Sequence, residues 1–147
     1  MHMQIRCHPV KSPPDIERLL GVLAEGGVNL IAVGGSDVEF GGQFAFVPED
    51  GHEELAIEIL KREEYRHEVI HANDRDDPRV RYEDIPAGRG SLHEFVTRVS
   101  RENLDAGRII RDVLIGVQTD EQRDARVVPV HVYSEPVRSP KNVLTRG

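Results

Sequence analysis

A chain of 147 residues is long enough to bury a hydrophobic core and to form one ordinary domain or two small ones. Its net charge of -7 argues against a nucleic-acid partner, because affinity for phosphate backbones depends mainly on Lys and Arg. The single cysteine, Cys7, excludes an intramolecular disulfide and an all-cysteine metal site. No apolar run approaches the roughly 20 residues that cross a bilayer, and no secretory signal is apparent, so we expect a cytoplasmic protein without a membrane partner.

The first half of the chain predicts the order strand, helix, strand, strand, helix, strand, which is that of a ferredoxin-like unit. The predicted strands cover residues 3–10, 28–33, 43–47 and 66–72, and the predicted helices cover residues 13–25 and 52–65. We expect Ile5 and Cys7 to share one face of the first strand.

The helix predicted over residues 13–25 has one apolar face, made of Ile16, Leu19, Leu20 and Leu23. Gly26-Gly27 ends it, because glycine adopts the left-handed C-cap conformation at little cost. The following run, 28–33, is apolar without alternation, which is typical of a strand covered on both faces or placed at the centre of a sheet. The glycine pairs at 34–35 and 41–42 predict a hairpin connection.

Residues 74–78 form a polar, charge-rich break that predicts a linker between two units. The expected units are 1–73 and 79–134, with residues 135–147 as a mobile or docked tail. Beyond the linker the pattern predicts a strand over 79–83, a loop over 86–90 and a helix that begins with a Ser91–Glu94 capping box. It then predicts a strand over 108–118, a polar hairpin loop over 119–124 and a last strand in which Val128, Val130 and Val132 alternate with other residues.

Pro129 indicates an edge position or a bulge in that last strand. The second unit stops before a second helix and a fourth strand. We therefore predict an α+β protein, in which a ferredoxin-like βαββαβ unit precedes a truncated βαββ unit. Because a half-unit cannot bury its sheet alone, it should lean on the first unit or on a second subunit, and we expect a homodimer.

The segment Leu19–Leu30, with the sequence LLGVLAEGGVNL, resembles the ACT-domain family. These are small ferredoxin-like regulatory modules whose first helix ends in Leu-Ala-Glu-x-Gly-Val-Asn-Ile. The second unit resembles the family in its Asp-x-Pro-Gly-x-Leu loop, with extra residues inserted between Asp84-Ile85-Pro86 and Leu92. The resemblance covers residues 3–72 well and 79–133 loosely. It implies sheets paired side by side that hold a small effector, usually an amino acid, without catalytic activity.

The resemblance also implies where the ligand binds, namely at backbone groups of the loop between the first strand and the first helix. A helix N-terminus there offers unpaired N–H groups and a positive dipole end, which suit an α-carboxylate. In the first unit this loop carries two prolines and Asp15, so we expect a degenerate site. The predicted ligand-binding residues are Asn29, Leu30, Asp84, Ile85, Pro86, Gly88, Gly90, Ser91 and Leu92.

Simpler roles fit several of these residues equally well. Gly88 and Gly90 suit an ordinary turn, Ser91 a helix cap, and Asn29 the entry to a strand. His67 and His71 share a strand face but lie too far apart for one ion, and we predict no metal site and no cofactor. The alternative functions are a small enzyme with an acid/base pair in an intersubunit cleft, and a structural module that pairs with a protein through its sheet edge.

Overall fold

The computed structural model describes residues 2–10, 12–36 and 42–137. The first unit consists of β1 (Met3–Cys7), α1 (Pro13–Glu25), β2 (Leu30–Ser36), β3 (Gln43–Pro48), α2 (Glu53–Arg62) and β4 (His67–His71). The second consists of β5 (Val80–Pro86), α3 (Ser91–Asp105), β6 (Arg108–Ile115), α4 (Asp120–Ala125) and β7 (Val127–Pro136). Two antiparallel sheets result, with strand orders β2-β3-β1-β4 and β5-β7-β6.

These orders confirm the predicted α+β class. The first sheet has the complete ferredoxin-like order, and the second reproduces its β1, β2 and β3 as β5, β6 and β7. The described chain contains no second long helix and no fourth strand in the second unit, as predicted. Several elements are shorter than predicted: β1 ends at Cys7, α2 at Arg62 and β6 at Ile115.

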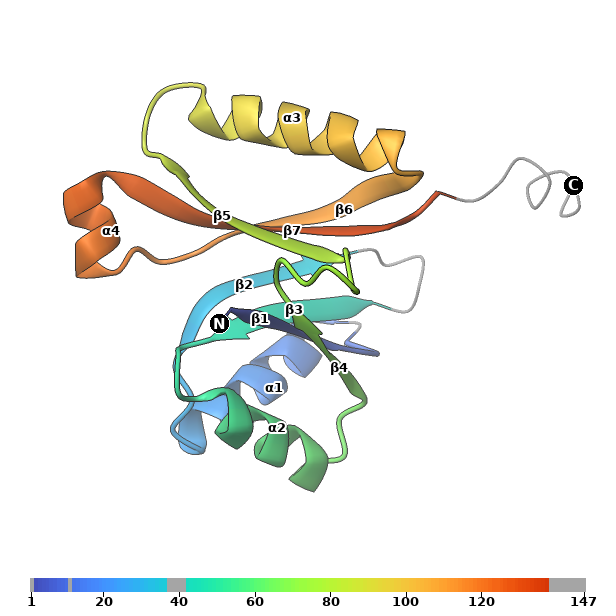
Figure 1. Cartoon of the computed structure of the whole chain (residues 1–147). Helices are drawn as coiled ribbons and strands as arrows, with labels where there is room; N and C mark the ends of the chain where they lie inside the picture. The colour runs from blue at the N-terminus through green and yellow to red at the C-terminus, as the bar shows by residue number, and fades with distance from the viewer. Residues whose placement is uncertain (1, 11, 37–41, 138–147) are drawn as a thin grey trace, which may run out of the picture.

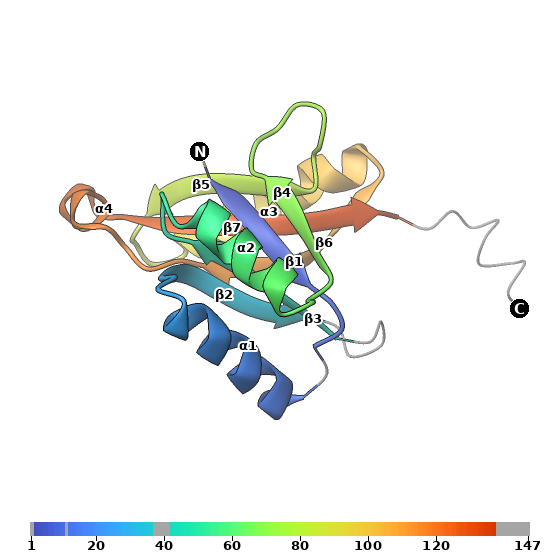
Figure 2. The same cartoon turned by 90° about the horizontal axis from the view of Figure 1, so that it is seen from below.

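The elements lie in four layers (Figure 1): α1 and α2, then the first sheet, then the second sheet, then α3. Figure 2 shows α1 and α2 side by side on the outer face of the first sheet. The side-by-side pairing of the two sheets that we expected is wrong, since their inner faces pack on each other and no strand of one sheet joins the hydrogen-bonded ladder of the other in the described chain. The truncated unit thus buries its free sheet face on the first unit.

Each outer face carries an apolar core. In the first unit, α1 and α2 bury side chains against alternate residues of β1 and β3, and the largest of these are Ile5, Leu19, Leu23, Phe46, Ile59 and Leu60. In the second unit, Phe95 and Val99 of α3 pack on Ile85, Val130 and Val132. Cys7 lies in the first core, as expected, and burial raises the pKa of its thiol to about 12.

The inner faces meet partly through small apolar side chains. Leu114 of β6 packs on Ala32, Ala45 and Val47 of the first sheet. Gly34 permits this contact, because a Cβ atom there would lie 3.1 Å from Cγ of Leu114. The close approach of two sheets therefore explains a glycine that the sequence pattern assigned to a turn.

The predicted hairpin is confirmed, since β2 and β3 are consecutive antiparallel strands. The glycine pair at 34–35 belongs to β2, where it pairs with Ala45 and Phe44, and not to the turn of this hairpin. Its continuation falls at 37–41, outside the described residues. β2 is also an edge strand rather than a central one. Its apolar run serves the sheet-to-sheet contact through Ala32, whereas Val33 on the other face remains half exposed.

A buried ion pair joins the two sheets. Arg6 of β1 donates Nη2 to Oδ2 of Asp112 on β6 at 2.6 Å, and the two side chains are only 4% and 6% exposed. The guanidinium lies 3.6 Å from the ring centroid of Tyr133, and it also donates to Gln4 and Gln43. These bonds compensate the desolvation of two charges, which would otherwise destabilise the interface.

An aromatic cluster lies elsewhere in the same interface. His2 stacks on Tyr82 with ring centroids 3.9 Å apart, and His131 approaches Tyr82 edge-on at 5.0 Å. His131 is 1% exposed, and its Nδ1 has no hydrogen-bond partner in the described chain. Burial, with a smaller contribution from His2, lowers the pKa of His131 to about 4, so the ring is neutral near pH 7.

Two predictions for the second unit are corrected by local structure. The polar segment 119–124 is not a plain hairpin loop but the start of α4, since Thr119 and Gln122 form a reciprocal capping box. The Ser91–Glu94 capping box does not form: Gly90 occupies the N-cap position with φ of 81°, and Ser91 is the first helical residue. Gly90 has no side chain, so this N-cap supplies no side-chain hydrogen bond to the first turn of α3.

Pro129 lies in β7, the central strand of its sheet, and not on an edge strand as one predicted alternative had it. Its carbonyl accepts from the Gly116 N–H at 2.9 Å, just beyond the last β6 pair, Ile115 with Val130. The missing N–H of Pro129 therefore faces a point where β6 has ended. The last strand also continues to Pro136, so the predicted tail starts too early, and residues 138–147 lie outside the described residues.

The Arg6–Asp112 pair leads to a first prediction. Arg6→Met should lower the free energy of unfolding by about 3–5 kcal/mol, because it leaves the Asp112 carboxylate buried without its cation. The double variant with Asp112→Leu should recover most of this loss. Urea denaturation at pH 7 measures both variants. If the double variant lost as much free energy of unfolding as the Arg6→Met and Asp112→Leu variants lose together, the two side chains would not be coupled.

His131 leads to a second prediction. Its pKa is about 4 in the folded protein against 6.5 as the ordinary value, so between these pH values the unfolded state binds the extra proton. Above pH 6.5 the ring is neutral in both states and the free energy of unfolding is not reduced. As the pH falls from 6.5 toward 4, protonation of the unfolded state lowers the free energy of unfolding by about 3 kcal/mol. His131→Phe should lose correspondingly less stability than the wild type between pH 7 and pH 4 in urea denaturation. The exposed control His93→Gln should behave as the wild type, and identical pH profiles for all three would contradict the assignment.

Candidate ligand-binding site

The loop between β5 and α3 is where the structure places most of the predicted ligand-binding residues. Pro86 ends β5, the Gly88 N–H donates to the Pro86 carbonyl at 3.0 Å, and the Ser91 N–H donates to the Gly88 carbonyl at 3.1 Å. Ala87 is tied to the end of α4 by its N–H bond to the Arg126 carbonyl at 2.8 Å. The loop is thus a tight, internally bonded turn that delivers the chain to the start of α3.

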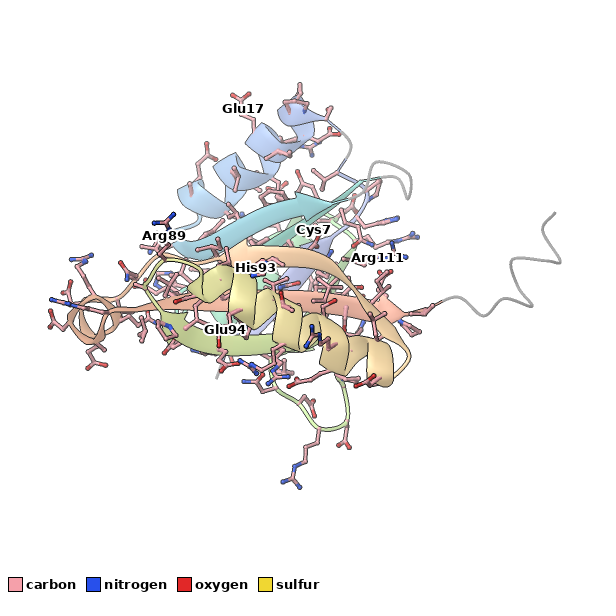
Figure 3. The ribbon with its side chains drawn as sticks, turned by 90° about the horizontal axis from the view of Figure 1, so that it is seen from above. Cys7, Glu17, Arg89, His93, Glu94 and Arg111 are labelled. Carbon is pink, nitrogen blue, oxygen red and sulfur yellow. The ribbon has the colours of Figure 1, made fainter. Side chains whose placement is uncertain are left out.

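The first turn of α3 leaves donors available. Among the described residues, the N–H groups of Leu92 and His93 have no protein acceptor. Unpaired N–H groups at a helix start carry the positive end of the helix dipole, which favours a bound anion. Figure 3 shows Arg89, His93 and Glu94 around this end of α3.

A pocket of about 130 Å³ lies beside the loop. Its lining includes three predicted residues, Ile85, Pro86 and Ser91. The other lining residues are Glu83, Glu94, Phe95 and Arg98. Ile85 and Phe95 give it a buried apolar floor, while the glutamates and the arginine bring charges of both signs to its rim.

Arg98 is fixed across this pocket by ion pairs. Its Nη2 lies 3.2 Å from each carboxylate oxygen of Glu83, and its Nη1 lies 3.8 Å from Glu102 one helical turn away. These pairs are about half exposed, so they contribute little to stability. A ligand with a carboxylate and an ammonium group could exchange with them without leaving a charge unpaired.

The remaining predicted residues serve other contacts. Asp84 faces the aromatic cluster, where its carboxylate accepts from the Tyr82 hydroxyl at 2.5 Å and from Gln122 at 3.0 Å. Burial, and next the bond to Asp84, raises the pKa of Tyr82. Gly88 and Gly90 shape the turn, and Leu92 is partly exposed on the first turn of α3.

Asn29 and Leu30 lie in the first unit, away from this loop in sequence and sheet. The Asn29 N–H donates to Nδ1 of His52 at 3.0 Å, and its carbonyl accepts from Glu49. Leu30 packs against the core under α1 and α2. Of the predicted residues, the structure therefore brings Ile85, Pro86 and Ser91 together at one pocket, whereas Asp84 contacts Tyr82 and Gln122, and Asn29 and Leu30 lie in the first unit.

Sequence reasoning missed Glu83, Glu94 and Arg98 as pocket residues. The signal available was the spacing of Glu94 and Arg98, which places both on one face of a helix. Three arginines of α3 and β6 have separate partners: Arg98 pairs with Glu83, Arg111 pairs with Glu135, and Arg108 bonds to Ser134.

Within the described residues no group of three or more His, Cys, Asp or Glu side chains is arranged to hold a metal ion. The helices of the described chain are also all too short or too polar to cross a bilayer.

No protein-family model matches the sequence, and no curated protein matches it. Solved structures do match its fold. Protein BT0572 from Bacteroides thetaiotaomicron superposes with a TM-score of 0.60 at 16% identity, covering 90% of this chain and 78% of that chain. The regulatory subunit of aspartate kinase from Thermus thermophilus, in a ligand-free form, gives 0.54 at 20% identity, covering 90% and 82%.

A structure of aspartokinase alpha and beta subunits gives a TM-score of 0.55 at 16% identity, covering 91% of this chain and 82% of that chain. At these identities the likeness is one of fold. It supports the ACT-like fold that the resemblance of residues 19–30 implies.

Proposed function

We propose that this protein is a regulatory module that binds a small molecule, of the amino-acid class, at the loop between β5 and α3. The observation that carries the proposal is the pocket at the start of α3, where Glu83, Glu94 and Arg98 bring charges of both signs to an apolar floor. The helix turn that contributes Ser91 and Glu94 to the pocket also carries the unpaired N–H groups of Leu92 and His93. The likeness in fold to a regulatory subunit of aspartate kinase agrees with a regulatory role.

The chemistry of the pocket favours a zwitterion. The N–H groups of Leu92 and His93 and the guanidinium of Arg98 suit a carboxylate, and the carboxylates of Glu83 and Glu94 suit an ammonium group. A volume of about 130 Å³ restricts the ligand to a small molecule. We expect these residues to bind the ligand without turnover.

A thermal-shift screen of the amino acids tests this function. At a hundredfold excess over Kd, a ligand should stabilise the folded protein by about 2.7 kcal/mol. At roughly 2–4 °C per kcal/mol for a chain of about this size, that corresponds to a rise in Tm on the order of 5–11 °C. The amide resonances of Leu92 and His93 should shift on titration with the same ligand.

Two matched variants sharpen the screen. Ser91→Leu fills the pocket and should abolish these amide shifts, while Thr97→Leu, on the same helix but outside the pocket, should keep them. No rise in Tm with any amino acid at 10 mM, or binding that leaves Leu92 and His93 unperturbed, would refute the proposal.

We further propose that the protein forms a homodimer through β6. The two edges of the second sheet differ: on β5 the side-chain amide of Asn73 bonds to both the N–H and the carbonyl of Tyr82, which blocks strand addition there. In the described chain no side-chain amide bonds to the backbone of the β6 edge in this way. The side chains of Val113 and Ile115 on β6 are 38% and 54% exposed. A second copy related by two-fold symmetry would pair this edge and cover both side chains.

Light scattering coupled to size-exclusion chromatography tests the dimer. The wild type should elute with twice the mass of the 147-residue chain, and Ile115→Lys should elute as a monomer because a charge would be desolvated at the interface. Val33→Lys, on the exposed face of β2, is the matched control and should remain dimeric. A monomeric wild type would refute the proposal.

A further inference from the structure

Arg108, at the start of β6, differs from the other arginines that the described chain buries or half-buries. Arg6, Arg79 and Arg81 each form an ion pair with a carboxylate. Among the described residues, no carboxylate lies within ion-pair distance of Arg108, whose bonds go to Ser134. The Asp77 carboxylate interacts electrostatically with Arg108 from beyond that distance, but it is itself bonded to Arg79. A partly desolvated guanidinium without a directly bonded carboxylate would be stabilised by an anion from solvent.

Ser134 holds this guanidinium in a fixed position. Arg108 donates Nε to the Ser134 Oγ at 3.1 Å and Nη2 to the Ser134 carbonyl at 2.9 Å. Ser134 is itself 2% exposed and anchored by its N–H bond to the Arg79 carbonyl at 2.8 Å. The side chain is therefore pre-organised, and its remaining N–H groups are available to a ligand.

A pocket of about 290 Å³ adjoins this arginine. The outer face of the first sheet carries two helices, whereas that of the second carries only α3 (Figure 1). The lining of the pocket comes in part from the end of α3 and in part from the turn that follows β4. Val80 and Val132, each 1% exposed, are among its apolar lining, and Ala106 lines it at the end of α3.

The pocket also carries one available negative charge. Glu102 lines it, but its carboxylate already pairs with Arg81 and Arg98. Asp74 accepts the Asp76 N–H on Oδ1 at 2.9 Å, and its Oδ2 has no donor in the described chain. Arg108 and Asp74 thus leave one cationic and one anionic group for a ligand to match.

We infer that this pocket is a second binding site for a small zwitterion, whose carboxylate binds Arg108 and whose ammonium group binds Asp74. The site lies at the opposite end of α3 from Ser91, roughly 20 Å away along a 15-residue helix. It goes beyond the proposed function, because ligand binding here does not depend on occupancy of the loop between β5 and α3.

Titration of the ¹⁵N-labelled full chain tests the site with L-alanine and two relatives that each lack one charge, propionate and ethylamine. L-alanine should shift the Asn103 side-chain amide and the Gly107 and Arg108 backbone amides with saturation, and it should bind at least tenfold more tightly than either relative. Arg108→Gln should weaken L-alanine binding roughly tenfold or more, since it removes a charge-assisted hydrogen bond. Arg101→Gln, on the same helix but outside the pocket, should bind as the wild type.

Ala106→Leu is a second variant that fills the pocket without changing charge or the Ser134 bonds, and it should abolish the shifts in a protein with an unchanged spectrum elsewhere. Shifts that do not saturate, equal affinity for all three probes, or unchanged binding by Arg108→Gln would overturn the inference. Shifts confined to Leu92 and His93 would also overturn it while supporting the loop site. Shifts confined to Asn103–Arg108 would support it and count against the loop site.

Discussion

The structure depends on one contact, the packing of the second sheet's inner face on that of the first. A three-stranded sheet with a single long helix has one face without a cover, and it cannot be stable until that face is buried. Small residues of the first sheet accept Leu114, and the Arg6–Asp112 pair sets the relative position of the two sheets by a directional bond. The apolar contacts supply the driving force, and the buried pair restricts the ways in which the faces can meet.

The stacking of the two sheets leaves their faces buried to different extents. The inner faces of the two sheets are buried against each other, and the outer face of the first sheet is covered by α1 and α2. The outer face of the second sheet is covered only by α3, so pockets remain at both ends of that helix. The incomplete helical layer over the second sheet thus leaves polar side chains accessible in these pockets.

The charge balance of the two pockets points to one ligand chemistry. The pocket at Ser91 combines Arg98 with Glu83 and Glu94, and the pocket at Arg108 combines that guanidinium with Asp74. A ligand that carries both charges leaves neither group unmatched, whereas an anion or a cation alone satisfies one and repels the other. A net charge of -7 on the whole chain is compatible with such local balance.

The sequence by itself determined the α+β class, the succession of the seven strands and of the three longer helices, and the truncation of the second unit, but it did not predict α4. Apolar periodicity and glycine stops such as Gly26-Gly27 are local signals. It also located the loop at Gly88 and Gly90. Only the tertiary structure decided that the sheets stack, that Gly34 belongs to a strand facing Leu114, and that Arg98 and Arg108 line pockets. Those outcomes depend on contacts between residues far apart in the chain, which no local pattern encodes.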